Sequence, residues 1–142
     1  MNKRISIVRF LRELLCFGTE VILDFIFEQG LLYISVKNIG KRPAYKVSVE
    51  FDKTFTGVGG KKNVSKLPMF QCIEFLPPQK EIRTFLDTSS SYFSRKEPTF
   101  ISTTVRYQNS IGQKYSNKAD HNLEIYRDIG YVVENDGLKD GK

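Results

Sequence analysis

The chain contains no tryptophan, a single histidine and only two cysteines, Cys16 and Cys72. Two cysteines cannot build the disulfide framework of a small secreted domain. A single bridge between them stays open, although their spacing favours two separate thiols that are buried and reduced. One histidine and two distant cysteines also lack the paired ligand spacing of a structural zinc site, so no metal is expected.

Long hydrophobic runs are missing as well. No segment reaches the ~18 consecutive apolar residues that a membrane-spanning helix needs. The first four residues, MNKR, resemble the charged start of a signal peptide, but Arg9, Arg12 and Glu13 interrupt the apolar stretch that follows. The sequence therefore predicts no export signal. We expect a cytoplasmic protein, or one held peripherally at the inner face of the membrane.

The composition is that of a folded β-rich domain. The 142 residues suffice for one domain with a buried core. Forty per cent of them are hydrophobic and 27 per cent are charged, which argues against disorder. Eleven Phe and seven Tyr, with many Val and Ile, favour strands because such side chains pack well on a pleated surface. We expect an extension at 1–18, a domain at 19–128 and a tail at 129–142.

The net charge of +6 comes from 22 Lys and Arg against 16 Asp and Glu. A basic excess favours an anionic partner, such as a membrane surface or nucleic acid. Here the bases are dispersed, which is typical of a feature that keeps a protein soluble. Nucleic acid is therefore an unlikely partner on this pattern, and a membrane surface stays open. The candidate contacts to an anionic surface are Lys3, Arg4, Arg9 and Arg12.

Residues 31–51 carry the clearest structural signal. Apolar side chains recur at every second position, first from Leu32 to Val36 and then from Tyr45 to Phe51. Between the two runs lies the segment NIGKRP, which is rich in turn-forming residues. A period of two with Gly and Pro punctuation predicts a pair of half-buried strands. The second run is expected to direct Tyr45 and Val47 to the same face.

Further short strands are expected along the chain. They are predicted at 21–28, 72–76, 81–86, 100–107, 114–116 and 121–126, with a turn at Gln29-Gly30 and another at 109–112. The longest loops are expected at 54–66 and at 87–98. About seven short strands at this spacing predict an all-β, antiparallel sandwich.

Residues 3–16 carry the only helical pattern. Ile7, Val8 and Leu11 share one side of a helical wheel, and Gly18 is a stop signal. A short amphipathic helix is expected here, either capping the sandwich or lying on a membrane or partner. An N-terminal strand remains the alternative.

Short motifs carry a resemblance to a known family. The spacing of Asn38, Gly40, Ala44 and Val47 resembles a signature of immunoglobulin-like adhesion-related domains of bacteria and archaea, the CARDB-like group. The segment FLPPQK at 75–80 is similar to the turn before the next strand in such domains. The resemblance covers 21–126. It implies a seven-stranded immunoglobulin-like sandwich without catalytic residues, and it carries over no site residues.

No motif predicts a reaction. His121 stands beside Asp120, but adjacent strand residues point to opposite faces, which argues against an acid–base pair. The segment GVGGKK at 57–62 has the wrong spacing for a phosphate-binding loop and is expected to be a flexible surface loop. A stacking platform for nucleic acid around Tyr107 and Tyr115 is disfavoured, because Tyr107 shares parity with the core residue Val105. We therefore expect no enzyme, no cofactor and no small-molecule substrate.

The sequence instead favours a binding or structural module that acts through protein–protein interaction. Long loops on a rigid sandwich are common recognition sites. The candidate partner-binding loop consists of Gly57, Gly59, Gly60, Lys61 and Lys62. An unpaired edge strand is a second candidate, through strand addition. The alternative is attachment to an anionic membrane or nucleic acid through the basic N-terminus and loops.

Overall fold

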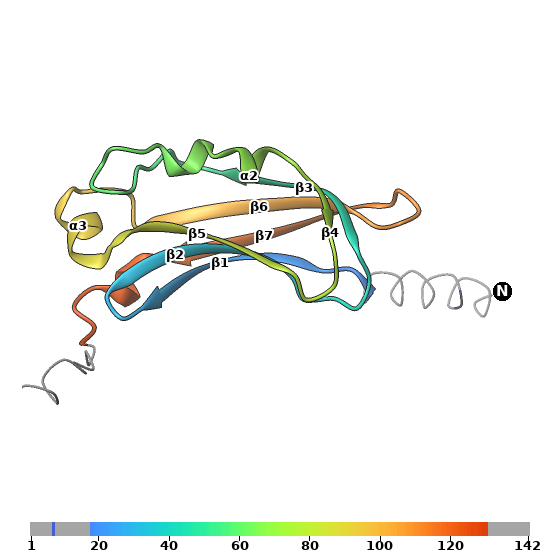
Figure 1. Cartoon of the computed structure of the whole chain (residues 1–142), viewed down its shortest axis with the longest axis horizontal. Helices are drawn as coiled ribbons and strands as arrows, with labels where there is room; N and C mark the ends of the chain where they lie inside the picture. Colours follow the sequence, from blue (N-terminus) through green and yellow to red (C-terminus); the bar gives the residue numbers. More distant parts are fainter. Residues whose placement is uncertain (1–6, 8–17, 131–142) are drawn as a thin grey trace, which may run out of the picture.

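The computed structural model describes Ile7 and residues 18–130. Its strands form two antiparallel sheets (Figure 1). The strands are β1 (Val21–Glu28), β2 (Leu31–Asn38), β3 (Ala44–Phe51), β4 (Ile73–Leu76), β5 (Glu81–Thr88), β6 (Phe100–Gln108) and β7 (Lys114–Asn122). The short helices are η1 (Val64–Lys66), α2 (Pro68–Gln71), α3 (Ser89–Ser94) and η2 (Leu123–Tyr126). The prediction of an all-β chain is confirmed at the level of two antiparallel sheets.

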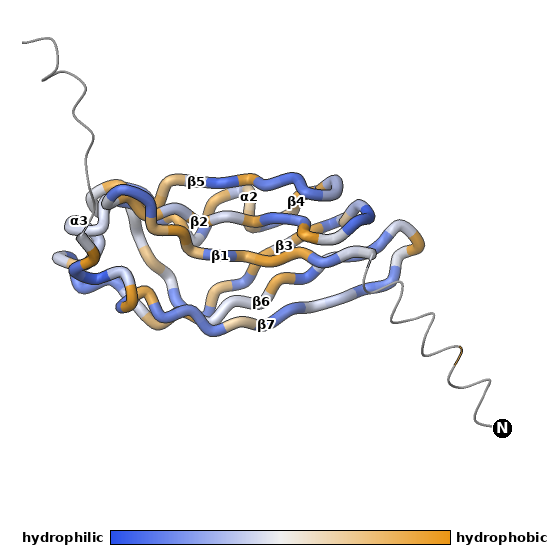
Figure 2. The backbone as a smooth tube through the Cα atoms, turned by 90° about the horizontal axis from the view of Figure 1, so that it is seen from below, coloured by the Kyte–Doolittle hydropathy of each residue, from blue (hydrophilic) through white to orange (hydrophobic). Residues whose placement is uncertain are grey.

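The first sheet has the strand order β1-β2-β5, and the second has the order β4-β3-β6-β7. Strands β5 and β7 lie at opposite margins of the molecule in Figure 2, with the other strands between them. On the β1 side, the side-chain amide of Asn117 in β7 donates to the Val21 carbonyl at 2.9 Å. The Tyr126 hydroxyl donates to the Phe25 carbonyl at 3.0 Å. These two hydrogen bonds join β1 to β7 of the second sheet and to η2, which follows β7.

The buried core contains the apolar side chains that recur at every second position along β1 and β2. Leu32, Ile34 and Val36 are fully buried, as the sequence predicts. They face inward-pointing residues of the other sheet, among them Ile101 and Val105 of β6. Burying such aliphatic side chains contributes roughly 1.5–3 kcal/mol each, which is why a strict period of two specifies these strands so well.

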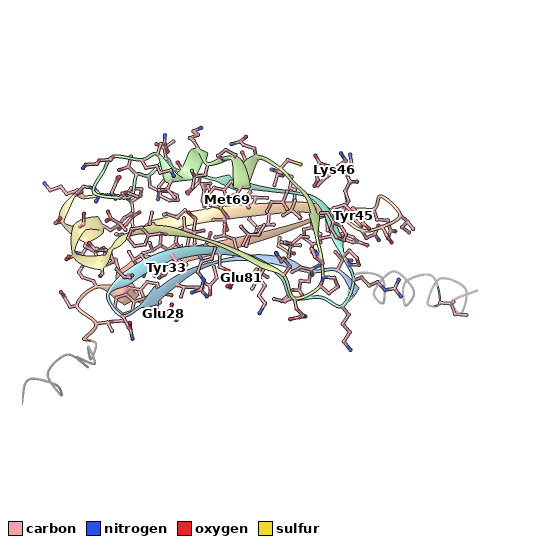
Figure 3. All side chains as sticks on the ribbon, in the orientation of Figure 1. Glu28, Tyr33, Tyr45, Lys46, Met69 and Glu81 are labelled. Carbon is pink, nitrogen blue, oxygen red and sulfur yellow. The ribbon has the colours of Figure 1, made fainter. Side chains whose placement is uncertain are left out.

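The expected face of Tyr45 is wrong. Lys46 has a φ of +51°, and the pairing of β3 with β6 shifts register between Tyr45 and Ser48. This bulge inserts an extra residue, so that Ala44 and Val47 both point into the core while Tyr45 points outward. The Tyr45 ring packs against Phe75 of β4, with ring centroids 5.4 Å apart. Figure 3 shows Tyr45 and Lys46 close together near the start of β3.

Asn38 joins three segments at one end of the sandwich. Its buried side chain donates to the carbonyls of Arg42 at 2.8 Å and Leu76 at 3.0 Å, and it accepts from the Gly40 amide at 2.9 Å. A Cβ on Gly40 would lie 2.7 Å from the Gly18 carbonyl oxygen, so the residue must be Gly. The Asn-x-Gly motif therefore closes the turn between β2 and β3 and fixes it to β4.

Two expected elements differ from the structure. The predicted strands at 114–116 and 121–126 are instead one nine-residue strand, β7, followed by the 3₁₀ helix η2. The predicted loop at 87–98 contains α3, whose N-cap Thr88 accepts a hydrogen bond from the Ser91 amide. Asp87 and Thr88 belong to β5. The polar sequence of both regions hides these elements, because it lacks an apolar period.

Other expectations concern the cysteines and the N-terminus. Cys72 is exposed rather than buried. Loss of hydration, the hydrogen bond to Glu74 and its charge raise the pKa of the Cys72 thiol, which favours the protonated form. The helix predicted at 3–16, together with Cys16, lies outside the described residues except for Ile7. Within the described part of the chain, no helix has the length and apolar character to cross a membrane.

Candidate binding site

The two loops that the sequence singles out meet at the α3 end of the sandwich. Asp87, at the end of β5, is almost completely buried. It accepts a hydrogen bond from the guanidinium of Arg95, which follows α3. The same guanidinium donates to the Thr56 carbonyl at 2.9 Å and to the Ser91 hydroxyl at 2.7 Å. Arg95 therefore connects the loop at 54–66 to β5 and α3.

A second acidic group extends this network. The Glu97 carboxylate accepts hydrogen bonds from both the amide and the hydroxyl of Thr56, the amide bond measuring 2.7 Å. It also lies 3.8 Å from the Arg95 guanidinium. Side chains that are paired in this way keep their positions better than isolated surface charges. Thr56, at the base of the loop, is thus held on two sides.

Residues 57–62 form a small hairpin on this base. Gly57 and Lys62 pair through two backbone hydrogen bonds of 2.8 and 3.2 Å. The Val58 amide donates to the Leu86 carbonyl at 2.8 Å, and the Gly59 amide contacts the Asp87 carboxylate at 3.3 Å. A Cβ on Gly57 would lie 2.0 Å from the Leu86 carbonyl oxygen, so only Gly fits there. These contacts attach the segment, which the sequence predicts to be a flexible surface loop, to the end of β5.

The hairpin tip presents a mixed apolar and basic surface. Val58 is 41 per cent exposed and has a φ of +55°. This φ is a rare conformation for a β-branched residue and is associated with backbone strain. Gly59 and Gly60 also have positive φ, and Lys61 and Lys62 are exposed. Three of the five predicted loop residues, Gly59, Gly60 and Lys61, thus lie at the tip, while the paired Gly57 and Lys62 form its base. Val58 is the residue that sequence reasoning missed.

A groove of about 550 Å³ lies beside α3, next to the β1–β2 hairpin. Its lining includes Phe27, Ser90, Phe93, Ser94 and Arg127. The Arg127 guanidinium lies 4.5 Å from the centre of the Phe93 ring, and it is paired with Glu124. The lining mixes serine and threonine hydroxyls with apolar side chains, and its arginine is already paired with a carboxylate. It therefore shows no arrangement that selects a ligand.

His121 has a structural environment. Its Nε2 lies 3.2 Å from the Thr103 hydroxyl, and its ring meets the Phe25 ring edge to face at 5.1 Å. Burial lowers the pKa of His121, against the opposing charges of Asp24 and Asp120. Asp120 instead accepts from the Ser102 hydroxyl on the outer face. Among residues 18–130 and Ile7, no three His, Cys, Asp or Glu side chains group as metal ligands.

The other sequence predictions concern the N-terminal bases and the pair of tyrosines. Lys3, Arg4, Arg9 and Arg12 lie outside the described residues. Tyr107 is buried, as predicted, and packs against Tyr115 with ring centroids 5.6 Å apart.

The fold and the site define a two-sheet antiparallel β domain with a basic hairpin braced at one end. A family model described as Domain of unknown function (DUF8453) matches residues 19–127. The chain therefore belongs to this family. Comparison with curated proteins and with solved structures finds no match.

Proposed function

We propose that the chain is an immunoglobulin-like sandwich that acts as a non-enzymatic protein-binding module. The strand orders β1-β2-β5 and β4-β3-β6-β7 support the immunoglobulin-like assignment, because β2 pairs with β5 in one sheet and β3 pairs with β6 in the other, as strands B with E and C with F do in that architecture. The fourth strand pairs with the third, a variation found among related sandwiches. The resemblance of the Asn38 turn to CARDB-like domains is consistent with the same proposal.

The observation that carries the proposed binding role is the braced hairpin at 57–62. An exposed Val58 with positive φ costs backbone energy, and the bonds to Leu86 and Asp87 keep it in place. Strain that the surroundings impose at an exposed position is a common property of functional sites. A loop that is ordered before binding also loses less entropy when a partner binds. The hairpin therefore has the properties of a recognition element.

Its chemistry indicates the kind of partner. Lys61 and Lys62 stand exposed beside the aliphatic side chain of Val58. Complementary charges steer association, whereas a desolvated apolar contact supplies much of the affinity. We therefore infer a protein surface with an apolar depression bordered by carboxylates.

The test is capture of a partner from extracts of the native cell. The double variant Lys61→Glu/Lys62→Glu should lose captured protein at least tenfold relative to the wild type. The matched control is Lys114→Glu/Lys118→Glu on β7, which changes the net charge equally at another margin of the sandwich. Equal losses in the two double variants would contradict the proposed site.

The variant Val58→Gly distinguishes the backbone strain at Val58 from the contact of its side chain with a partner. Glycine accepts positive φ, so the substitution should leave the melting temperature unchanged or raise it. Capture should fall, because the apolar contact is removed. A variant that loses stability and retains capture would show that Val58 supports the fold alone.

Attachment to an anionic membrane or nucleic acid is the second candidate, through Lys3, Arg4, Arg9 and Arg12. It predicts binding to anionic liposomes or DNA that falls steeply as salt rises. Salt-independent or absent binding would remove it.

A further inference from the structure

The free edge of β5 is open to another strand. The Asn38 amide donates to the Lys80 carbonyl at 3.1 Å, and β2 pairs with β5 in continuous register from Tyr33 to Lys37. Because backbone groups alternate in direction along a strand, Ile82 and Thr84 bond to β2. The amides and carbonyls of Glu81, Arg83 and Phe85 then point away from the sheet. Nothing in the described part of the chain bonds to them.

The other strand edges are less available. The Val21 and Phe25 carbonyls on β1 already accept from Asn117 and Tyr126. Strand β4 has only four residues, and its Leu76 carbonyl accepts from Asn38. Strand β7 presents Lys114, Lys118 and Asp120 along its outer face, and charged side chains of this kind discourage pairing. Within 18–130, the β5 edge is the most accessible.

The charges on β5 do not protect its edge in this way. Arg83 is drawn back over its own sheet, where it pairs with Glu28 and Glu81 at 3.2 Å and covers the Tyr33 ring at 5.4 Å. Glu81 accepts from the Ser35 hydroxyl at 2.7 Å. Figure 3 shows Glu28, Tyr33 and Glu81 along this sheet. Ile82, between the two charged residues, is only partly buried against the core.

The edge is limited at both ends. The Leu86 carbonyl accepts from the Val58 amide, and Gln79 has a φ of +65° within the preceding turn. The accessible segment is therefore Glu81 to Phe85, with the sequence EIRTF.

This segment is complementary to itself in one antiparallel register. A two-fold axis at Ile82 places Glu81 of each copy opposite Arg83 of the other. The two Ile82 side chains then lie opposite each other, between these two charged pairs. Centring the axis on Arg83 would place like charges opposite each other, which is destabilising. Centring it on Thr84 would place Glu81 opposite Asp87 and would require the Leu86 carbonyl that Val58 already occupies. Only the register centred on Ile82 places opposite charges across from each other and uses backbone groups that have no other partner in the described part of the chain.

We propose that two copies of the chain associate through β5, in antiparallel register about Ile82, to form one continuous six-stranded sheet. The interface contains two reciprocal Glu81–Arg83 pairs, in which each Arg83 exchanges the Glu81 of its own chain for that of the second copy, and the backbone hydrogen bonds of those four residues. It leaves the hairpin at 57–62 outside the contact, so it is independent of the proposed partner-binding role. A contact of this small size predicts a reversible dimer with a dissociation constant on the order of 100 µM.

Charge exchange tests the pairing by sedimentation velocity of the full chain. Arg83→Glu places Glu opposite Glu, and Glu81→Arg places Arg opposite Arg, so each variant alone should dimerise at least tenfold more weakly. An equimolar mixture of the two variants restores opposite charges at both positions and should form a heterodimer. The control Lys118→Glu on β7 should dimerise like the wild type.

A disulfide tests the register. With Cys16 and Cys72 replaced by Ser, Ile82→Cys should form a covalent dimer on oxidation, because a directly opposed, non-hydrogen-bonded pair has Cα atoms ~4.5 Å apart. Thr84→Cys should crosslink far more slowly. A wild type that stays monomeric at several times the expected dissociation constant would overturn the proposal. So would a variant mixture that fails to associate, or equal crosslinking at both positions.

Discussion

Replacing Asn38 should destabilise the sandwich more than any exposed polar substitution. The side chain is fully buried and makes three hydrogen bonds, to Gly40, Arg42 and Leu76. Each such bond contributes about 1 kcal/mol net, and an unpaired buried group costs roughly 1–3 kcal/mol. Asn38→Ala removes all three bonds and leaves the Leu76 carbonyl without its partner. We expect a loss of about 3 kcal/mol in the free energy of unfolding.

Asn38→Asp distinguishes hydrogen bonding from shape. Aspartate can still accept from the Gly40 amide, but its carboxylate faces the carbonyls of Arg42 and Leu76 and cannot donate to them. It should therefore also destabilise the fold, despite nearly identical volume. The matched control is Asn122→Ala, which removes one exposed capping bond to the Glu124 amide and should cost about 1 kcal/mol or less.

The measurement is urea denaturation followed by circular dichroism, with the free energy of unfolding extrapolated to water. A loss for Asn38→Ala no larger than that for Asn122→Ala would refute the role assigned to this residue. An aspartate variant as stable as the wild type would refute the importance of the two donated bonds.

Two further predictions concern the brace and the histidine. Arg95→Ala leaves the buried Asp87 carboxylate without its cation and should cost about 3 kcal/mol. It should also speed tryptic cleavage after Lys61 and Lys62, whereas the exposed pair of Arg106 with Glu50 predicts a loss of at most about 1 kcal/mol for Arg106→Ala. Unchanged cleavage in Arg95→Ala would contradict the brace. His121 has a lowered pKa in the fold, so the unfolded chain binds the proton more readily and stability falls as pH drops below the ordinary value of 6.5. His121→Gln should reduce this loss in urea denaturation, and an equal loss in both proteins would contradict it.

The sequence predicts well the strands that have a regular apolar period, and it gives the wrong limits for β7, which lacks one. Strand β1 agrees with its predicted limits, 21–28, and β2 contains the predicted apolar run, in which Leu32, Ile34 and Val36 bury one face. Strand β7 has the sequence KYSNKADHN, in which apolar and polar residues do not alternate regularly. Its continuity comes from pairing with β6 along its whole length, which is a tertiary effect.

The bulge in β3 is a second feature that could not be predicted from the sequence. Nothing in the sequence AYKVSVEF marks Lys46 as the inserted residue, because Lys carries no turn preference of its own. A single insertion reverses the face of every residue before it, which explains the wrong prediction for Tyr45.

The candidate site is predictable in part. Glycines and lysines mark the hairpin at 57–62 as a surface loop, and its length suggests recognition. Its rigidity depends on Asp87, Arg95 and Glu97, which lie 25 or more positions away along the chain. Pairing over such a separation leaves no local pattern, so the loop appears flexible when the sequence is considered alone.

Site-specific photo-crosslinking in the native cell tests the central claim most directly. A photoreactive residue at Val58 is compared with one at Ile111, an exposed aliphatic residue in the β6–β7 turn at the other end of the sandwich (Figure 1). The proposed function predicts one discrete protein adduct at Val58, lost in Lys61→Glu/Lys62→Glu, and none at Ile111. The same adduct at both positions, or none at Val58, would contradict a binding role for the hairpin.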